Sequence, residues 1–265
     1  MNLNYLYLME RMKNSLPVLS KGQKLIANYI INNYDKAAFM TASKLGSIVG
    51  VSESTVVRFA MELGYKGYPE FQKSLQELIK NKLTSVQRIE ISSNRINENN
   101  VLKSVLISDL NKIKATIEEI NEDTFNKAVE CILSSKKIYI LGVRSSAALA
   151  GFMGFYFNLI FDNVRLVHTT SVSEMFEQIL KAGEGDVVIG ISFPRYSRRT
   201  INALKYVKSR GATVISITDS VLSPLSQYSD LVLTARSDMV SFADSLVAPL
   251  SVINALIVAI GIKKK

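Results

Sequence analysis

Cysteine, histidine and tryptophan are nearly missing from this 265-residue sequence, which has one cysteine, one histidine and no tryptophan. A single cysteine excludes an intramolecular disulfide framework and a cysteine-based zinc site. The one histidine, His168, argues against a histidine-rich metal site and against a hydrolase with a Ser-His-Asp triad. We therefore expect neither a bound metal nor a cofactor.

A long uninterrupted hydrophobic run is also missing. The longest apolar stretch, 246–262, contains Pro249, Ser251 and Asn254 and falls short of the ~20 residues that cross a bilayer. The N-terminal segment carries Glu10 and no small-residue cleavage site, so it does not resemble a secretory signal. We expect a soluble, cytoplasmic protein with no membrane partner.

The net charge is +9, and the excess is divided between the first 80 residues and the residues after 130. Basic chains favour polyanions, because lysine and arginine neutralise phosphates and release their counterions. No single stretch concentrates the charge, so charge alone does not establish nucleic-acid binding.

The two halves of the sequence have different periodicities. Residues 1–80 show helical spacing without strand alternation, whereas five short β-branched runs alternate with helical segments after residue 137. The five runs are KIYIL, VRLVH, DVVIGIS, ATVISI and DLVLTA. Strands alternating with helices predict right-handed βαβ units and a parallel sheet covered on both faces. The fold class is therefore an all-α N-terminal domain followed by an α/β domain.

The segment between the halves is polar from 81 to 100 and has helical apolar spacing from 101 to 120. A second short helix, about 123–134, leads into the first strand, with Asp123 as its expected N-cap. We expect a first domain over 1–80, a linker over 81–109 and a second domain over 110–265.

Residues 42–60 fit a helix-turn-helix. Gly50 stands where a tight turn needs positive φ, Ser52 is a good N-cap, and Gly46 stands where two helices would cross closely. Polar side chains remain on or near the outer face of the second helix: Glu53, Ser54, Thr55 and Arg58. Such groups suit base edges and phosphates in a major groove, but a three-helix packing module with a solvated second helix has the same spacing.

The runs LSKGQKLIANYIINN and SKLGSIVGVSESTVVRFAMELGYKGYPEFQKSL resemble the N-terminal domain of RpiR-type bacterial transcriptional regulators over roughly residues 15–80. The resemblance implies that Ser52, Ser54, Thr55 and Arg58 face double-stranded operator DNA. It also implies that Lys66, in the following GYKGYPEF, contacts phosphate.

Two predicted strands end in loops rich in hydroxyls and arginine, VRSS at 143–146 and SFPRYSRRT at 192–200. Both loops precede helices, and ligands of open parallel sheets bind beyond the carboxyl ends of the strands. The candidate anion-binding residues are Arg144, Ser145, Ser146, Ser192, Arg195, Ser197 and Thr200. Each serine taken alone could simply cap a helix, but the two loops together favour a ligand with one phosphate and several hydroxyls.

This half resembles a SIS (sugar isomerase) domain over about 110–262, a segment that includes GATVISITDSVLSPLSQYSDLVL. The resemblance implies a flavodoxin-like five-stranded sheet, self-association through helices and phosphosugar binding. Two loops depart from the family pattern. Arg144 replaces the second glycine of Gly-x-Gly-x-Ser, and Arg198 replaces the glycine of Ser-x-Ser-Gly-x-Thr in a loop three residues longer.

Candidate bases for a sugar isomerisation are Glu174, Glu177 and His168, but they form no catalytic constellation by pattern. We therefore expect no enzyme. The sequence predicts a DNA-binding transcriptional regulator of carbohydrate metabolism, a homodimer or homotetramer controlled by a phosphorylated sugar or amino sugar. The alternatives are a phosphosugar isomerase or lyase with an accessory helical domain, and a DNA-binding protein with a vestigial pocket.

Overall fold

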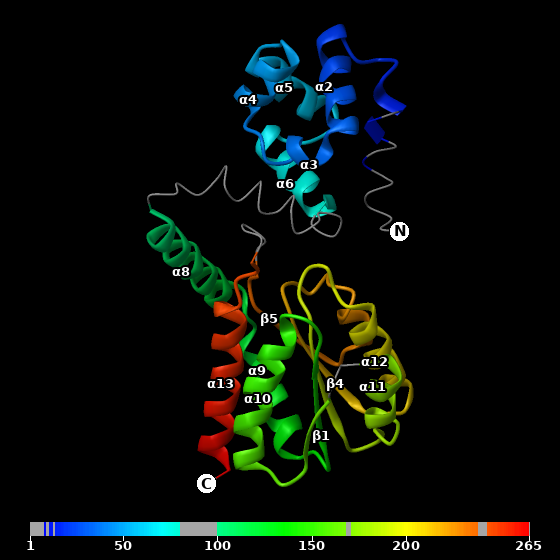
Figure 1. The fold of residues 1–265 in the computed structure, drawn as a ribbon, viewed down its shortest axis with the longest axis vertical. Coiled ribbons are helices and arrows are strands. Elements are labelled where there is room, and N and C mark those ends of the chain that lie inside the picture. The colour runs from blue at the N-terminus through cyan, green and yellow to red at the C-terminus, as the bar shows by residue number, and fades with distance from the viewer. Residues whose placement is uncertain are drawn as a thin grey trace. The chain divides into compact units, whose positions relative to one another are not determined.

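The computed structural model describes residues 8, 11–12, 14–79, 100–167, 171–237 and 243–264. The chain forms two compact units, which divide between Ile96 and Asn97 (Figure 1). Residues 81–99 of the expected linker and the candidate base His168 lie outside the described residues.

The N-terminal unit is helical, as predicted. Its elements are α2 (Lys21–Asn32), α3 (Tyr34–Ala37), α4 (Ala42–Val49), α5 (Glu53–Glu62) and α6 (Tyr68–Ile79). A capping box starts α2, because the Ser20 hydroxyl accepts from the Gln23 N–H and the Gln23 side chain accepts from the Ser20 N–H. The rings of Phe59 and Phe71 meet edge to face at 5.7 Å and join α5 to α6 in the core.

Three polar side chains of α6 attach it to the connection between α3 and α4. The Tyr68 hydroxyl donates to the Met40 carbonyl at 2.8 Å, and the Gln72 amide donates to the same oxygen at 2.6 Å. The Gln76 amide donates to the Ala38 carbonyl at 2.8 Å. Carbonyls without a helical partner are thereby satisfied, and the helix-turn-helix is held in one arrangement.

The C-terminal unit contains five parallel strands in the order β2-β1-β3-β4-β5. The strands are β1 (Ile138–Gly142), β2 (Val164–Leu166), β3 (Val187–Ile191), β4 (Thr213–Thr218) and β5 (Leu231–Thr234). Every residue of β1 and β3 is buried, which explains their continuous apolar sequences. The predicted flavodoxin-like sheet is confirmed, and its strand order reverses between β1 and β3.

Among the described residues, six α-helices accompany the sheet: α8 (Val101–Glu119), α9 (Glu122–Leu133), α10 (Ser146–Ile160), α11 (Val172–Ile179), α12 (Arg198–Ser209) and α13 (Val247–Lys263). One hydrophobic cluster joins α9, α10 and α13 to one face of the sheet, and a second joins α11 and α12 to the other (Figure 1). Helix α8 packs on α13. None of the helices in the described ranges is long and apolar enough to span a bilayer.

One helix start between the halves differs from expectation. The Asn121 side chain caps α9 by accepting from the Thr124 N–H at 2.8 Å, so the prediction that Asp123 is the cap was wrong. Asp123 instead lies in the first turn, where its carboxylate interacts favourably with the helix dipole. Residues 101–109, the last part of the expected linker, lie in α8, in the segment for which the sequence predicts helical spacing.

Candidate DNA-binding surface and anion site

The turn between α4 and α5 has the geometry that its glycines require. Gly50 ends α4 with φ +79°, a left-handed conformation. A Cβ added to Gly46 would lie 2.7 Å from the carbonyl oxygen of Val51, because α4 touches the backbone that leads into α5. The prediction of a close approach at Gly46 is confirmed.

The N-terminus of α5 presents a cluster of hydroxyls. The Ser52 hydroxyl accepts from the Thr55 N–H at 3.3 Å, and it lies 2.9 Å from the Ser54 hydroxyl and 2.8 Å from the Thr55 hydroxyl. One turn later, the Arg58 Nε donates to the Ser54 carbonyl at 3.3 Å. Ser52, Ser54 and Arg58 are exposed, and Thr55 is half-buried. The four residues expected to face DNA therefore form one surface on α5.

Lys66 lies in the loop between α5 and α6 and is exposed. Its backbone N–H donates to the Glu70 carboxylate at 2.7 Å, which fixes the loop against the first turn of α6. Its ammonium forms no ion pair with another described residue. The side chain is exposed to solvent, and its contact with a phosphate stays a prediction.

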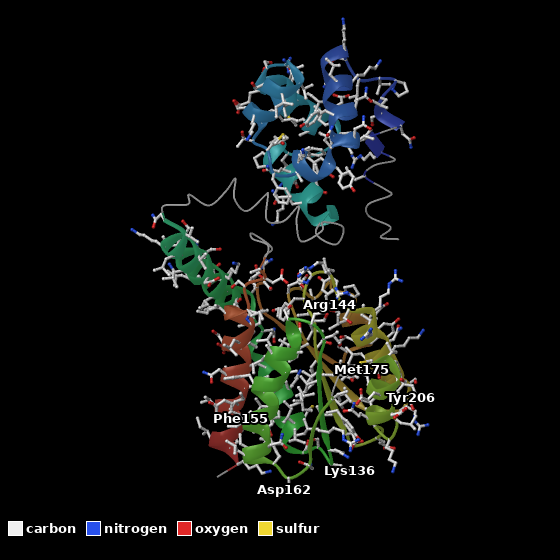
Figure 2. All side chains as sticks on the ribbon, viewed as in Figure 1. Lys136, Arg144, Phe155, Asp162, Met175 and Tyr206 are labelled. Carbon is white, nitrogen blue, oxygen red and sulfur yellow. The ribbon has the colours of Figure 1, made fainter. Side chains whose placement is uncertain are left out.

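A cavity of about 350 Å³ lies beyond the carboxyl ends of β1 and β3, where the strand order reverses. Figure 2 shows Arg144 at this end of the sheet, opposite the end that carries Lys136 and Asp162. Six of the seven predicted ligand residues line the cavity: Arg144, Ser145, Ser146, Ser192, Arg195 and Ser197. The fold therefore brings the two predicted loops together.

The loop between β3 and α12 is held by its own hydroxyls. Buried Ser192 accepts from the Ser197 N–H at 3.2 Å, and the Ser197 hydroxyl caps α12 by accepting from the Thr200 N–H at 3.4 Å. Ser197 thus both caps a helix and lines the cavity. Thr200 is fully buried and is not a lining residue, so its contact with a ligand stays a prediction.

Both loops contain an arginine in the left-handed region, Arg144 at φ +61° and Arg195 at φ +74°. They are the only residues other than glycine with positive φ in the described part of the chain. Such conformations cost about 1–3 kcal/mol each and cluster at functional sites. Arg144 keeps the backbone conformation that a glycine adopts readily, and it adds a cation.

Two contacts of the site have no local signal in the sequence. Arg195 forms an ion pair with Asp244, which lies 49 residues later in the chain and also lines the cavity. The Tyr196 hydroxyl donates to the Asp219 carboxylate at 2.8 Å. Only the folded topology brings Asp244 and Asp219 to these loops.

A second cavity, of about 560 Å³, adjoins the first and shares Val143, Arg144, Arg195 and Ser197 with it. Its other lining residues are Tyr196, Arg198 and Arg199, so four arginines line it.

The candidate bases lie elsewhere. Glu174 and Glu177 are exposed on α11 and line neither cavity, and the backbone N–H of Glu174 donates to the Ser171 hydroxyl at 3.1 Å. Across the described ranges, no cluster of histidine, cysteine, aspartate and glutamate is suited to hold a metal ion.

Two family models match the chain, one to each unit. The helix-turn-helix domain of the rpiR family matches residues 6–82, and the SIS domain matches residues 131–259. The chain belongs to the RpiR-type transcriptional regulators. In this RpiR-type regulator, α4 and α5 form the helix-turn-helix, and the two adjoining cavities lie in the SIS domain.

Known transcriptional regulators match most of the chain. The HTH-type transcriptional regulator HexR of Escherichia coli is 26% identical over 86% of this chain and 77% of its own length. An HTH-type transcriptional regulator of Clostridium perfringens is 26% identical over 87% of this chain and 82% of its own.

Solved structures share the fold. NanR of Vibrio vulnificus, complexed with ManNAc-6P, superposes with a TM-score of 0.56 and 22% identity over 97% of this chain and 92% of its own. The sugar isomerase domain of an RpiR transcription factor from Sphaerobacter thermophilus gives a TM-score of 0.57 and 28% identity over 61% of this chain and 89% of its own.

Proposed function

We propose that this RpiR-type regulator binds operator DNA through α5 and is controlled by a phosphorylated sugar or amino sugar in its SIS domain. The observation that carries the proposal is the meeting of two serine- and arginine-bearing loops in one cavity at the carboxyl ends of β1 and β3. Such a cavity matches the two chemical parts of the ligand. Its hydroxyls and helix N-termini suit the phosphate, and its other polar groups suit the sugar hydroxyls.

The DNA-binding part of the proposal depends on the exposed surface of α5. A recognition helix inserts the side chains near its N-terminus into the major groove, and Ser54, Thr55 and Arg58 occupy that part of α5. Lys66, on the loop after α5, would contact the phosphate backbone. Each phosphate that the protein neutralises adds to the dependence of binding on salt.

Control of DNA binding requires that the sugar site influence the segment that connects the SIS domain to the helix-turn-helix. Helix α8 is the part of that connection on the SIS side. The Ser245 hydroxyl donates to the Asp109 carboxylate of α8 at 2.6 Å. Ser245 directly follows Asp244, the partner of Arg195 in the cavity. A ligand that competes with Asp244 for Arg195 therefore changes the contacts of Asp244. Asp244 is adjacent to Ser245, which anchors α8.

A second anchor holds the C-terminal half of α8. The Arg236 N–H donates to the Thr116 hydroxyl at 2.9 Å, and the Arg236 guanidinium pairs with Glu119. Arg236 follows β5, the edge strand next to β4. These contacts of α8 support the expected coupling through residues 81–130, of which 100–130 are described.

A second copy of the chain is the proposed partner of the exposed apolar helices. Phe155 and Leu159 of α10 are 63% and 71% exposed, although the opposite side of α10 lies in the core (Figure 2). Leu102 of α8 and Ile262 of α13 are also mostly exposed. Helices that are apolar on both sides need a further surface to cover them, and a dimer fits a two-fold-symmetric operator.

The protein is proposed to be a sensor and not an isomerase or lyase. The support is the position of Glu174 and Glu177, which line neither cavity. Detectable interconversion of a phosphosugar by the purified chain would favour the enzymatic alternative.

The test is a thermal-shift screen of phosphorylated sugars and amino sugars against their unphosphorylated parents. A ligand present at 100 times its Kd stabilises the fold by about 2.7 kcal/mol. Ser192→Ala should reduce that shift, because it removes a cavity hydroxyl that also accepts from the Ser197 N–H. The matched control is Ser251→Ala, since Ser251 is exposed on α13 and lines neither cavity. An undiminished shift in Ser192→Ala would remove Ser192 from the site, and the absence of any shift would contradict phosphosugar control.

A further inference from the structure

We propose that the effector carries a second anionic group, a carboxylate or another phosphate, in addition to the phosphate bound by the serine-rich cavity. This inference rests on the proposed function and specifies the ligand class of the same site. Arg198 and Arg199 would hold the second group. The ligand is then a phosphorylated sugar acid or a sugar bisphosphate, and not a simple sugar monophosphate.

The first observation is that the two cavities adjoin. They share the walls formed by Val143, Arg144, Arg195 and Ser197, and each has the size of a small-molecule site, about 350 and 560 Å³. The cavity with Ser145, Ser146 and Ser192 has the hydroxyls, whereas Arg198 and Arg199 line only the other cavity. A single ligand that enters both cavities places one end among hydroxyls and the other end among guanidiniums.

The second observation is that Arg198 and Arg199 have no carboxylate partner among the described residues. Of the four guanidiniums around the larger cavity, only Arg195 has an acidic partner, Asp244. Arg144, Arg198 and Arg199 make no side-chain hydrogen bond or ion pair within the described part of the chain. Arg198 and Arg199 are exposed, and a single phosphate among the serines would leave both guanidiniums without an anionic partner.

The third observation is the position of the two arginines on α12. Arg198 and Arg199 are its first two residues, and the first turn contains no acidic side chain. Cations at a helix N-terminus oppose the helix dipole, so this arrangement is unfavourable without an anion nearby. An anionic group between the guanidiniums and the helix N-terminus removes that repulsion and gains charge-assisted hydrogen bonds. Within the SIS unit, Lys208, Arg236 and Lys263 are already paired with carboxylates.

The experiment compares ligands that differ by one anionic group on the same carbon skeleton. Binding of the full chain is measured by calorimetry for glucose 6-phosphate against 6-phosphogluconate, and for fructose 6-phosphate against fructose 1,6-bisphosphate. We expect the member with two anionic groups to bind about tenfold tighter or more in at least one pair, the gain typical of a charged hydrogen bond. Higher salt should reduce this preference.

Two variants locate the preference on the protein. The double substitution Arg198→Gln with Arg199→Gln should lower the affinity for the ligand with two anionic groups to that for the monophosphate. Arg210→Gln is the control, because it removes one positive charge at the other end of α12 and should keep the preference.

The outcomes separate this inference from the proposed function. Equal affinity for both members of each pair, with measurable monophosphate binding, would overturn the second anion and leave phosphosugar control intact. A preference that survives in the double variant would overturn the role of Arg198 and Arg199. If no phosphorylated compound binds, the proposed function fails, and this inference fails with it.

Discussion

Replacing Gly46 with alanine tests whether the close contact between α4 and the start of α5 positions the recognition helix. The added Cβ would lie 2.7 Å from the Val51 carbonyl oxygen and 3.4 Å from the Glu53 nitrogen. Both atoms belong to the backbone, so no side-chain rotation can relieve the contact. The turn itself would have to move, and it carries Ser52, the cap of α5.

The expected cost follows from two opposing effects. Inserting a methyl group into a packed contact costs about 1–3 kcal/mol, and the upper part of that range applies because backbone must shift. Alanine in place of glycine inside a helix returns about 1 kcal/mol. The net destabilisation of the N-terminal unit is therefore about 2 kcal/mol, which for a domain of this size lowers Tm by roughly 10 °C.

Gly151→Ala provides the matched control. Gly151 lies within α10, and a Cβ added there has no other atom within 4 Å, so the same substitution should stabilise the SIS unit by about 1 kcal/mol. Hydrogen exchange on the full chain reads the two units separately, and operator binding should weaken only in Gly46→Ala. An N-terminal unit of unchanged or greater stability in Gly46→Ala would refute the packing argument.

Three further predictions concern other parts of the molecule. Arg58→Ala should weaken operator binding by about 1–3 kcal/mol without changing the thermal midpoint, and equal affinity in a gel-shift titration would remove Arg58 from the interface. Asp109→Ala should leave ligand affinity intact but reduce the effect of the ligand on DNA affinity, because it breaks the bond from Ser245 to α8; an unchanged effect would exclude this route. Burial raises the pKa of Tyr68 from 10.0 to about 12. The protonated phenol is therefore favoured in the folded state, so the N-terminal unit should lose ~3 kcal/mol of stability between pH 10 and 12. In Tyr68→Phe, the denaturant midpoint should change less with pH over that range. An equal loss of stability in the variant would show that other groups cause it.

Much of the fold could be predicted from the sequence because it depends on local patterns. Gly50 and Ser52 fix the turn and the cap of the helix-turn-helix, and both act within a few residues of their own positions. The buried centre of the sheet could be predicted from the continuous apolar runs of β1 and β3, which are also local patterns. The loops of the cavity follow directly from the ends of those strands.

The acidic partner in the cavity depends on a contact between distant segments. Asp244 joins the cavity only because the connection from β5 to α13 returns to the loop containing Arg195. That contact has no signature in the local sequence. The cap of α9 is a local contact, but Asn121 and Asp123 are residue types that both cap helices well, so residue type alone did not decide between them.

The left-handed arginines bear on whether the pocket is vestigial, the alternative raised by the altered glycines. Replacing a glycine with Arg144 retains the backbone path at φ +61° while giving up the residue that adopts it most readily. Arg195, in the opposite loop, is also left-handed at φ +74° and pairs with Asp244. Strained conformations persist only where the surroundings over-determine them, and both arginines lie on the walls shared by the two cavities. The two arginines therefore fit a pocket that uses guanidinium contacts, and they argue against the loss of its ligand.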